Sequence, residues 1–125
     1  MIKKVHTDNA PPALGPYSQA IQAGDFLYVS GQIGLDKDGE VQEGIENQTK
    51  QIFANLQAVL EEAGADLSKV VKFTIFLDSM DDFATVNEIY GSYLQEPYPA
   101  RSTVEVSCLP KNLLVEMEAI VYLGE

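Results

Sequence analysis

Val70-Val71-Lys72-Phe73-Thr74-Ile75-Phe76-Leu77 (residues 70–77, VVKFTIFL) is the most strand-like segment of this chain. β-Branched and aromatic residues make up most of it, and such residues pack well on the pleated surface of a sheet. Alternation along a strand would place Val71, Phe73, Ile75 and Leu77 on one face. We therefore expect a well-buried strand in the middle of the chain.

Amphipathic helices are predicted on both sides of this strand. Between Gly44 and Gly64 apolar residues recur with helical spacing, which predicts one buried helix face. These residues are Ile45, Ile52, Phe53, Leu56, Val59, Leu60 and Ala63. The segment Ser79 to Asp82 has the spacing of a capping box and begins a second helix, which must end before Pro97. Its apolar stripe consists of Phe83, Val86, Ile89, Tyr90, Tyr93 and Leu94.

A β-hairpin in the N-terminal part of the chain is predicted from the segments 20–23 and 26–30. Both are short apolar or aromatic runs, and the pair Gly24-Asp25 between them is typical of a tight turn. Gly31 and Gly34 then interrupt the strand pattern, so we expect the second strand to end at Ser30.

Two further strands are predicted near the end of the chain, at residues 101–107 and 113–122. Polar and apolar residues alternate along both, and both sides of the second segment are largely apolar. The two strands could pair as a hairpin across the short intervening loop. Such a hairpin would bring Arg101 and Glu116 within a few residues of each other.

The predicted elements follow one another as two strands, a helix, a strand, a helix and two strands. This order predicts an α+β fold in which two helices cover one face of a mixed sheet. So short a chain has little left to cover the second face, and another copy of itself is the obvious source of that cover. We therefore expect a closed homo-oligomer.

The composition fits one domain that spans residues 1–125. With 125 residues, 46% of them hydrophobic, the chain can build one core. No apolar run is long enough to cross a membrane, and the N-terminal segment lacks the apolar region of a signal peptide. We expect a cytoplasmic protein without a membrane partner.

Charge and composition also argue against several kinds of site. The net charge of −11 comes from 19 acidic and 8 basic residues, which should repel nucleic acid. Cys108 is the only cysteine and His6 the only histidine. This excludes an internal disulfide and argues against a zinc site or a cysteine nucleophile. We expect neither a metal nor a cofactor.

Arg101 and Glu116 are the charged residues with two competing interpretations. Arg101 follows the stiff segment Tyr98-Pro99-Ala100 and could form a surface ion pair, or could bind a carboxylate through the parallel donors of its guanidinium group. Glu116 lies within a predicted strand. It could face solvent together with Glu118, or could orient or deprotonate a water molecule in a cleft.

The segment GPYSQA, residues 15–20, holds Tyr17 on a rigid piece of chain. Pro11, Pro12 and Pro16 lack amide donors and push the residues before them toward extended geometry, which excludes a helix. A rigid connector beside a sheet either seals an edge of the core or presents a side chain to a ligand.

Five segments together resemble the RidA (YjgF) family of reactive-intermediate deaminases. They are GPYSQA (15–20), YVSGQIGLD (28–36), NLQAVLEEAGA (55–65), VNEIYGSYL (86–94) and PARSTVEVSCLPKNLLVEMEAI (99–120). The resemblance covers essentially the whole chain in the same order. It implies a chorismate-mutase-like α+β protomer and a homotrimer with a central β-barrel and ligand clefts between subunits.

The resemblance also implies an activity and roles for individual residues. Members of the family hydrolyse 2-imino acids and their enamine tautomers, such as 2-iminopropanoate and 2-iminobutanoate, to 2-keto acids and ammonia without a cofactor. By this resemblance Arg101 would bind the substrate carboxylate, Glu116 would hold the attacking water and Tyr17 would line the cleft. The other cleft residues would be Ser30, Gly31, Asn87 and Thr103.

Two positions depart from the family pattern. Thr103 stands where the archetypal deaminases carry cysteine, and Cys108 stands where an arginine is often found. The family's cysteine is thought to act largely through its backbone, so we expect threonine to preserve catalysis.

Two other functions are compatible with the same residues. A trimer could bind a keto acid or a related metabolite through the same arginine without catalysis. Endoribonuclease activity or inhibition of translation has been attached to relatives, but the acidic composition and the absence of a basic groove argue against it.

Overall fold

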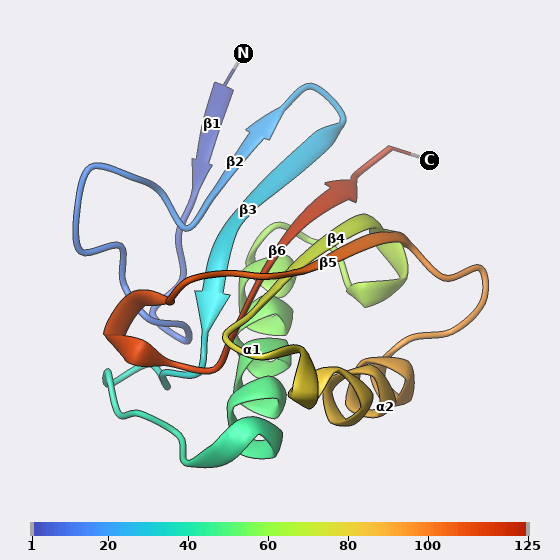
Figure 1. Ribbon diagram of the computed structural model, residues 1–125. Coiled ribbons are helices and arrows are strands. Elements are labelled where there is room, and N and C mark those ends of the chain that lie inside the picture. The colour runs from blue at the N-terminus through green and yellow to red at the C-terminus, as the bar shows by residue number, and fades with distance from the viewer. Residues whose placement is uncertain (1, 125) are drawn as a thin grey trace.

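The computed structural model describes residues 2–124 and contains one six-stranded sheet with two α-helices on one face (Figure 1). The elements are β1 (Ile2–Val5), β2 (Ala20–Ala23), β3 (Phe26–Ile33), α1 (Gly44–Glu62), β4 (Val70–Leu77), α2 (Phe83–Tyr93), β5 (Ala100–Glu105) and β6 (Val115–Tyr122). The strands lie in the order β1-β2-β3-β6-β4-β5. Only the β4 and β5 pair is parallel, so the sheet is mixed and the predicted α+β fold is confirmed.

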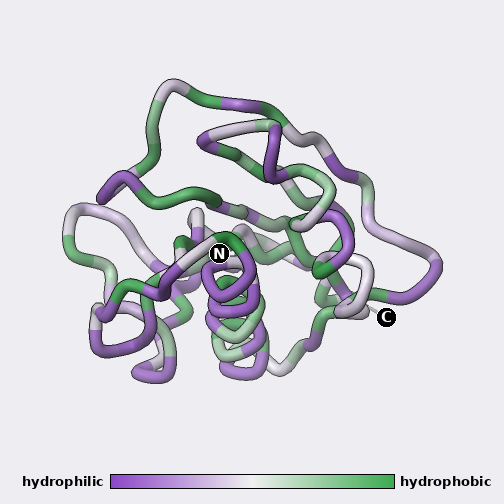
Figure 2. Tube along the Cα trace, turned by 60° about the horizontal axis from the view of Figure 1, so that its bottom comes forward, coloured by the Kyte–Doolittle hydropathy of each residue, from purple (hydrophilic) through white to green (hydrophobic). Residues whose placement is uncertain are grey.

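Helix α1 lies where the apolar spacing predicts it. Figure 2 shows bands of hydrophilic and hydrophobic residues alternating along the longer helix, as expected for a helix with one buried face. Gly64 adopts a φ of 78°, a left-handed conformation that suits glycine after a helix. The amide of Ala65 then donates to the Leu60 carbonyl at 2.8 Å and closes the helix.

Strand β4 has the predicted bounds, but the assignment of Val71 to its buried face is wrong. Phe73, Ile75 and Leu77 are buried, whereas Val71 is 42% exposed and Val70 is buried in its place. The pairing with β6 shifts register between Val70 and Lys72. This irregularity reverses the alternation at the start of the strand.

The hairpin that was considered possible between the last two strands does not form, because β4 lies between them. Strand β5 runs parallel to β4, with Arg101 opposite Phe73, and β6 runs antiparallel to β4, with Glu116 opposite Phe76. Helix α2 provides the crossover that a parallel pair requires. The central position of β6 accounts for its largely apolar sequence on both sides.

Two strand features at the N-terminal side differ from the sequence-based expectation. The sequence did not predict β1, a short edge strand whose Lys3 and Lys4 resemble a solvated loop. Strand β3 continues to Ile33 rather than ending at Ser30. Gly31 does not end the strand, because it lies in a β-bulge where the register shifts between Val29 and Gln32.

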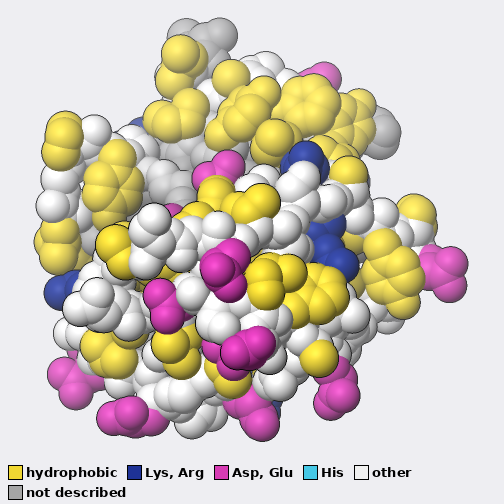
Figure 3. All heavy atoms as spheres, in the orientation of Figure 1, with side chains coloured by type: hydrophobic (Ala, Val, Ile, Leu, Met, Phe, Trp, Pro, Cys, Tyr) yellow, Lys and Arg dark blue, Asp and Glu magenta, His cyan; other side chains and the backbone are white. Residues whose placement is uncertain are grey.

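No helix within residues 2–124 covers the second face of the sheet, which is rich in apolar side chains. Phe26 and Tyr28 are 38% and 48% exposed, and the Phe26 ring packs against Tyr122 with centroids 5.3 Å apart. Figure 3 shows hydrophobic side chains gathered along the upper part of the molecule, over β1 to β3 and the end of β6. We call the side of the sheet that faces away from α1 and α2 the open face. No helix among residues 2–124 combines the length and apolar character needed to cross a bilayer.

Candidate functional site

Arg101 and Glu116 lie on opposite faces of the sheet. Residues directly opposite each other on neighbouring strands point to the same side. Arg101 is opposite the fully buried Phe73 and therefore lies on the helix-covered face. Glu116 is opposite Phe76, which alternates with the buried residues of β4, and lies on the open face. Within one chain these two candidate residues do not share a site.

Arg101 is the only arginine of the chain, and side chains of α2 contact its guanidinium group. Its Nη1 donates to Asn87 Oδ1 at 2.6 Å. The guanidinium carbon lies 4.9 Å from the centroid of the Tyr90 ring and 5.6 Å from that of Phe83. A guanidinium group has further donors, so the bond to Asn87 leaves enough of them to bind a carboxylate in bidentate fashion.

Phe83 and Tyr90 were assigned from the sequence only to the apolar stripe of α2. Their contact with Arg101 was missed because it depends on β5 lying beside α2, which the predicted hairpin did not include. The spacing of Phe83, Asn87 and Tyr90 was the available signal, since residues three and four apart share a helix face.

Thr103 lies on the same face as Arg101, two residues further along β5 and opposite Ile75. Its hydroxyl is buried and has no hydrogen-bond partner among residues 2–124, and the same holds for the hydroxyl of Tyr90. The structure thus brings Arg101, Asn87 and Thr103 to one side of the sheet. We call these three residues the Arg101 group.

Glu116 lies against Gly31 on the open face. Ser30 and Gly31 form the bulge of β3, where both residues stand opposite a single position of β6. A Cβ at position 31 would lie 2.8 Å from Glu116 Cδ, which real Cβ atoms essentially never approach. Only a glycine at position 31 therefore leaves room for this position of the Glu116 side chain.

The surroundings of Glu116 favour its protonated form. Burial raises the pKa of Glu116, and repulsion from the neighbouring Glu118 raises it further. A carboxylate with a raised pKa accepts a proton more readily near neutral pH than an ordinary glutamate does. This property suits a general base that deprotonates water.

Tyr17 is presented to the outside of the chain. Its side chain is 56% exposed, which excludes a role in sealing the core of this chain. The next residue, Ser18, accepts a hydrogen bond from Ser30 Oγ at 2.6 Å through its carbonyl, and the Ser30 amide donates to the Gln19 carbonyl at 2.9 Å. These bonds tie the segment that carries Tyr17 to the bulge of β3. We call Tyr17, Ser30, Gly31 and Glu116 the Glu116 group.

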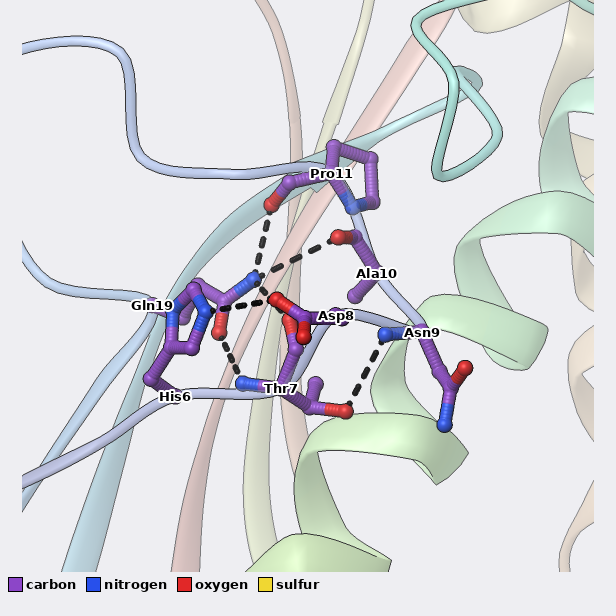
Figure 4. A network of polar contacts seen from close by, with 7 residues as sticks. All are labelled: His6, Thr7, Asp8, Asn9, Ala10, Pro11 and Gln19. Carbon is purple, nitrogen blue, oxygen red and sulfur yellow. Dashed lines mark hydrogen bonds and ion pairs between the residues drawn. The ribbon is translucent and has the colours of Figure 1, made fainter.

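Gln19 anchors the proline-rich connector from inside the protein (Figure 4). Its buried side chain accepts from the Thr7 amide at 2.7 Å and donates to the carbonyls of Thr7 and Pro11 at 3.1 and 2.8 Å. His6 and Asp8 form a pair on the outer side of this network, 3.0 Å apart. This role could not be predicted from the sequence, because a glutamine in GPYSQA is equally compatible with a solvated turn.

One cavity of the single chain lies away from both groups. This cavity of about 540 Å³ is lined by the ends of α1 and α2 and by neighbouring loops, including Glu61, Asp66, Tyr93 and Pro97. Its lining contains no residue of the Arg101 group or the Glu116 group. Among the described residues, no cluster of three or more His, Cys, Asp or Glu side chains could hold a metal ion.

Comparison with known proteins identifies the family. The family model described as Endoribonuclease L-PSP matches residues 7–123, nearly the whole chain. The chain belongs to the RidA (YjgF) family. A RutC family protein of Pyrococcus horikoshii is 52% identical over 124 residues, which cover 98% of each chain. The 2-iminobutanoate/2-iminopropanoate deaminase of Mus musculus is 47% identical over 124 residues, or 98% of this chain and 92% of that protein.

Solved RidA structures share the same fold. The crystal structure of RidA from an Antarctic Psychrobacter superimposes with a TM-score of 0.93 at 46% identity, covering 96% of this chain and 98% of that one. The RidA resemblance predicted from the motifs is therefore confirmed, and with it the mixed sheet covered by two helices. The roles of the individual site residues stay predictions.

Proposed function

We propose that this protein hydrolyses 2-imino acids and their enamine tautomers, such as 2-iminopropanoate and 2-iminobutanoate, to 2-keto acids and ammonia. The observation that carries the proposal is the position of the Arg101 guanidinium group. This group is exposed and bonded to Asn87 of α2, and its remaining N–H donors can bind a substrate. The deaminase name of the murine relative supports the same reaction.

Arg101 would bind the carboxylate of the imino acid. A guanidinium group presents parallel donors that match the two carboxylate oxygens, and lysine has no equivalent geometry. The net charge of −11 repels anions at long range, but a contact this close is only weakly affected by a screened field. One well-placed arginine is therefore sufficient to orient the substrate.

Glu116 would activate the water. Its carboxylate takes a proton from water as the oxygen attacks the carbon of the C=N bond, and passes this proton to the nitrogen, which gives a carbinolamine. Glu116 then takes the hydroxyl proton of the carbinolamine and delivers it to the amino nitrogen as the C–N bond breaks, which releases ammonia and the keto acid and restores the carboxylate. An imine is already electrophilic, so positioning and electrostatic support are the main contributions required of the protein.

The complete site would form between two copies of the chain. Because Arg101 and Glu116 lie on opposite faces of one sheet, one copy would supply the Arg101 group and its neighbour the Glu116 group. The apolar open face supports a closed assembly, which we take to be a homotrimer with a central β-barrel. Tyr17 would then line the cleft from the Glu116 side.

Trapping of the imine tests the proposal. Threonine and a threonine dehydratase generate 2-iminobutanoate, which semicarbazide captures as a semicarbazone. We expect the wild-type protein to lower semicarbazone formation and Arg101→Ala to lose this effect. Lys69→Ala, which removes an exposed cation bonded to the Gly124 carbonyl, is the matched control and should behave as the wild type. Equal activity of Arg101→Ala and the wild type would refute the assigned site.

RNA cleavage is the weaker candidate, although the matching family model carries an endoribonuclease description. Contacts to phosphates need clustered Lys or Arg side chains. This chain has 8 basic residues against 19 acidic ones, and Arg101 is held beside α2 rather than within a basic surface.

A further inference from the structure

The guanidinium group of Arg101 is held on several sides by one row of residues on α2. Asn87 accepts its hydrogen bond at 2.6 Å, and the Tyr90 and Phe83 rings lie 4.9 and 5.6 Å from the guanidinium carbon. Both ring distances are within the range of a cation–π contact. The conformational freedom of the Arg101 side chain is therefore restricted before substrate binds.

Tyr90 is the most firmly fixed member of this row. It is only 5% exposed, and its ring packs edge-on against Phe73 at 5.3 Å and against Phe53 at 6.2 Å. Phe73 is also the residue opposite Arg101 in the sheet. The core thus sets the position of the Tyr90 ring, and the ring in turn sets the position of the guanidinium group.

The hydroxyl of Tyr90 does not account for a tyrosine at this position. It is buried and has no hydrogen-bond partner within the described part of the chain. Burial also raises the pKa of Tyr90, so the hydroxyl stays neutral at physiological pH. The face of the aromatic ring is then the part of the residue that acts on Arg101.

We propose that Tyr90 is a positioning residue that holds the Arg101 guanidinium group in the orientation that binds the substrate carboxylate. This inference rests on the function proposed above. A restrained arginine loses less conformational freedom on binding than a free one, so the effect belongs to carboxylate affinity rather than to the chemical step. Changes at Tyr90 should therefore alter KM and Kd and leave kcat nearly unchanged.

Substitutions at position 90 test the proposal. We expect Tyr90→Leu to raise the Kd for 2-oxobutanoate, measured by calorimetry, and the KM for 2-iminobutanoate by roughly three- to tenfold. Tyr90→Phe keeps the ring and should bind as the wild type does. Tyr93→Leu is the matched control, because Tyr93 is on the same helix but stacks on Phe53 at 4.3 Å. An unchanged Kd in a folded Tyr90→Leu variant would overturn the proposal.

A double-mutant cycle separates positioning from general loss of structure. If Tyr90 acts through Arg101, Tyr90→Leu should have no further effect on binding once Arg101→Ala is present. An equal loss of affinity in both backgrounds would overturn the proposal. Should Tyr90→Leu fail to fold, fluorinated phenylalanine at position 90 keeps the shape of the ring while weakening its negative face. Affinity must then fall with increasing fluorination, and constant affinity would refute the role.

The proposed reaction and the role of Tyr90 can fail separately. Wild-type protein that binds 2-oxobutanoate but does not hydrolyse 2-iminobutanoate would refute the deaminase function. The binding comparison between Tyr90→Leu and Tyr90→Phe would still support or overturn positioning of Arg101.

Discussion

Gly31 leaves the space that the side chain of Glu116 occupies: a Cβ at position 31 would lie 2.8 Å from Glu116 Cδ and 3.2 Å from Glu116 Cγ. The bulge of β3 fixes the backbone of Gly31, so any added side chain must displace the glutamate. The position of the proposed base therefore depends on a residue that has no side chain of its own.

Gly31→Ala should lower turnover while leaving the free energy of unfolding nearly unchanged. The added methyl group meets the end of a flexible side chain, so Glu116 can move at little cost to the free energy of unfolding. Misplacing a catalytic group by about 1 Å can lower turnover by roughly 100-fold, and we expect a loss of that order. Gly91→Ala is the control, because a Cβ at position 91 has no neighbour within 4 Å. Full activity of Gly31→Ala would contradict the assignment of Glu116.

Glu116→Gln should abolish most turnover while leaving the keto-acid product bound. Glutamine keeps the size of the side chain but cannot accept the proton of water, and loss of a general base typically costs about 10²- to 10⁴-fold. Imine trapping and calorimetry with 2-oxobutanoate measure the two properties. Glu62→Gln, at an exposed position at the end of α1, serves as control. Turnover at the wild-type rate by Glu116→Gln would favour another base.

Glu116→Gln should also make the folded protein more stable, by an amount that depends on pH. The pKa of Glu116 is raised in the folded protein, first by burial and then by Glu118. The folded state therefore binds the proton more tightly than the unfolded chain, so this group's contribution to stability is present at low pH and is lost as pH rises through the folded pKa. Glu116→Gln should be more stable than the wild type at about pH 8, and the difference should shrink toward about pH 4. Thermal unfolding at both values measures it, and a gain that grows on acidification would contradict the shift.

Gln19→Leu should destabilise the N-terminal part of the protein. The substitution leaves the buried Thr7 amide and carbonyl and the Pro11 carbonyl without the partner they have now. Unsatisfied buried groups cost roughly 1–3 kcal/mol each, so we expect a loss in that range or above it in chemical denaturation. Gln22→Leu is the control, because within residues 2–124 the side-chain amide of Gln22 bonds only to the exposed Gly24 carbonyl. Equal stability of the two variants would show that the network in Figure 4 contributes little.

Thr103→Val should be neutral or stabilising and should keep turnover. Valine has nearly the same shape and removes a buried hydroxyl that has no partner within residues 2–124, a group whose burial costs about 1–3 kcal/mol on the basis of protein mutational data. Urea unfolding and imine trapping measure the two effects. A large loss of turnover would mean that the Thr103 hydroxyl contacts substrate in the assembled protein.

The helices and most strands followed from local patterns, because hydrophobic spacing reports directly on burial. The bounds of β4 were predicted to the residue, and α1 occupies the range predicted for a helix between Gly44 and Gly64. Helix α2 begins after the predicted cap, where Ser79 accepts from the Asp81 amide at 3.1 Å. The order of the strands in the sheet could not be predicted from such local patterns. A short loop between the segments that became β5 and β6 favoured a hairpin, whereas the parallel pairing with β4 depends on where α2 packs.

The site was predicted as a set of residues but not as an arrangement. The motifs pointed to Arg101, Asn87 and Glu116, and the structure joins the first two through a hydrogen bond. The face on which each side chain lies depends on register, and one bulge or one misassigned partner strand changes it. The contacts of Tyr90 with Arg101 and of Gly31 with Glu116 therefore emerged only from the folded chain.

The placement of Arg101 and Glu116 on opposite faces of one sheet has a consequence for mixed assemblies. Subunits with Arg101→Ala keep the glutamate, and subunits with Glu116→Gln keep the arginine. When the two inactive proteins are unfolded together and reassembled, some interfaces should pair an intact arginine with an intact glutamate. Turnover in the mixture would then rise well above that of either parent, which is the signature of intersubunit complementation.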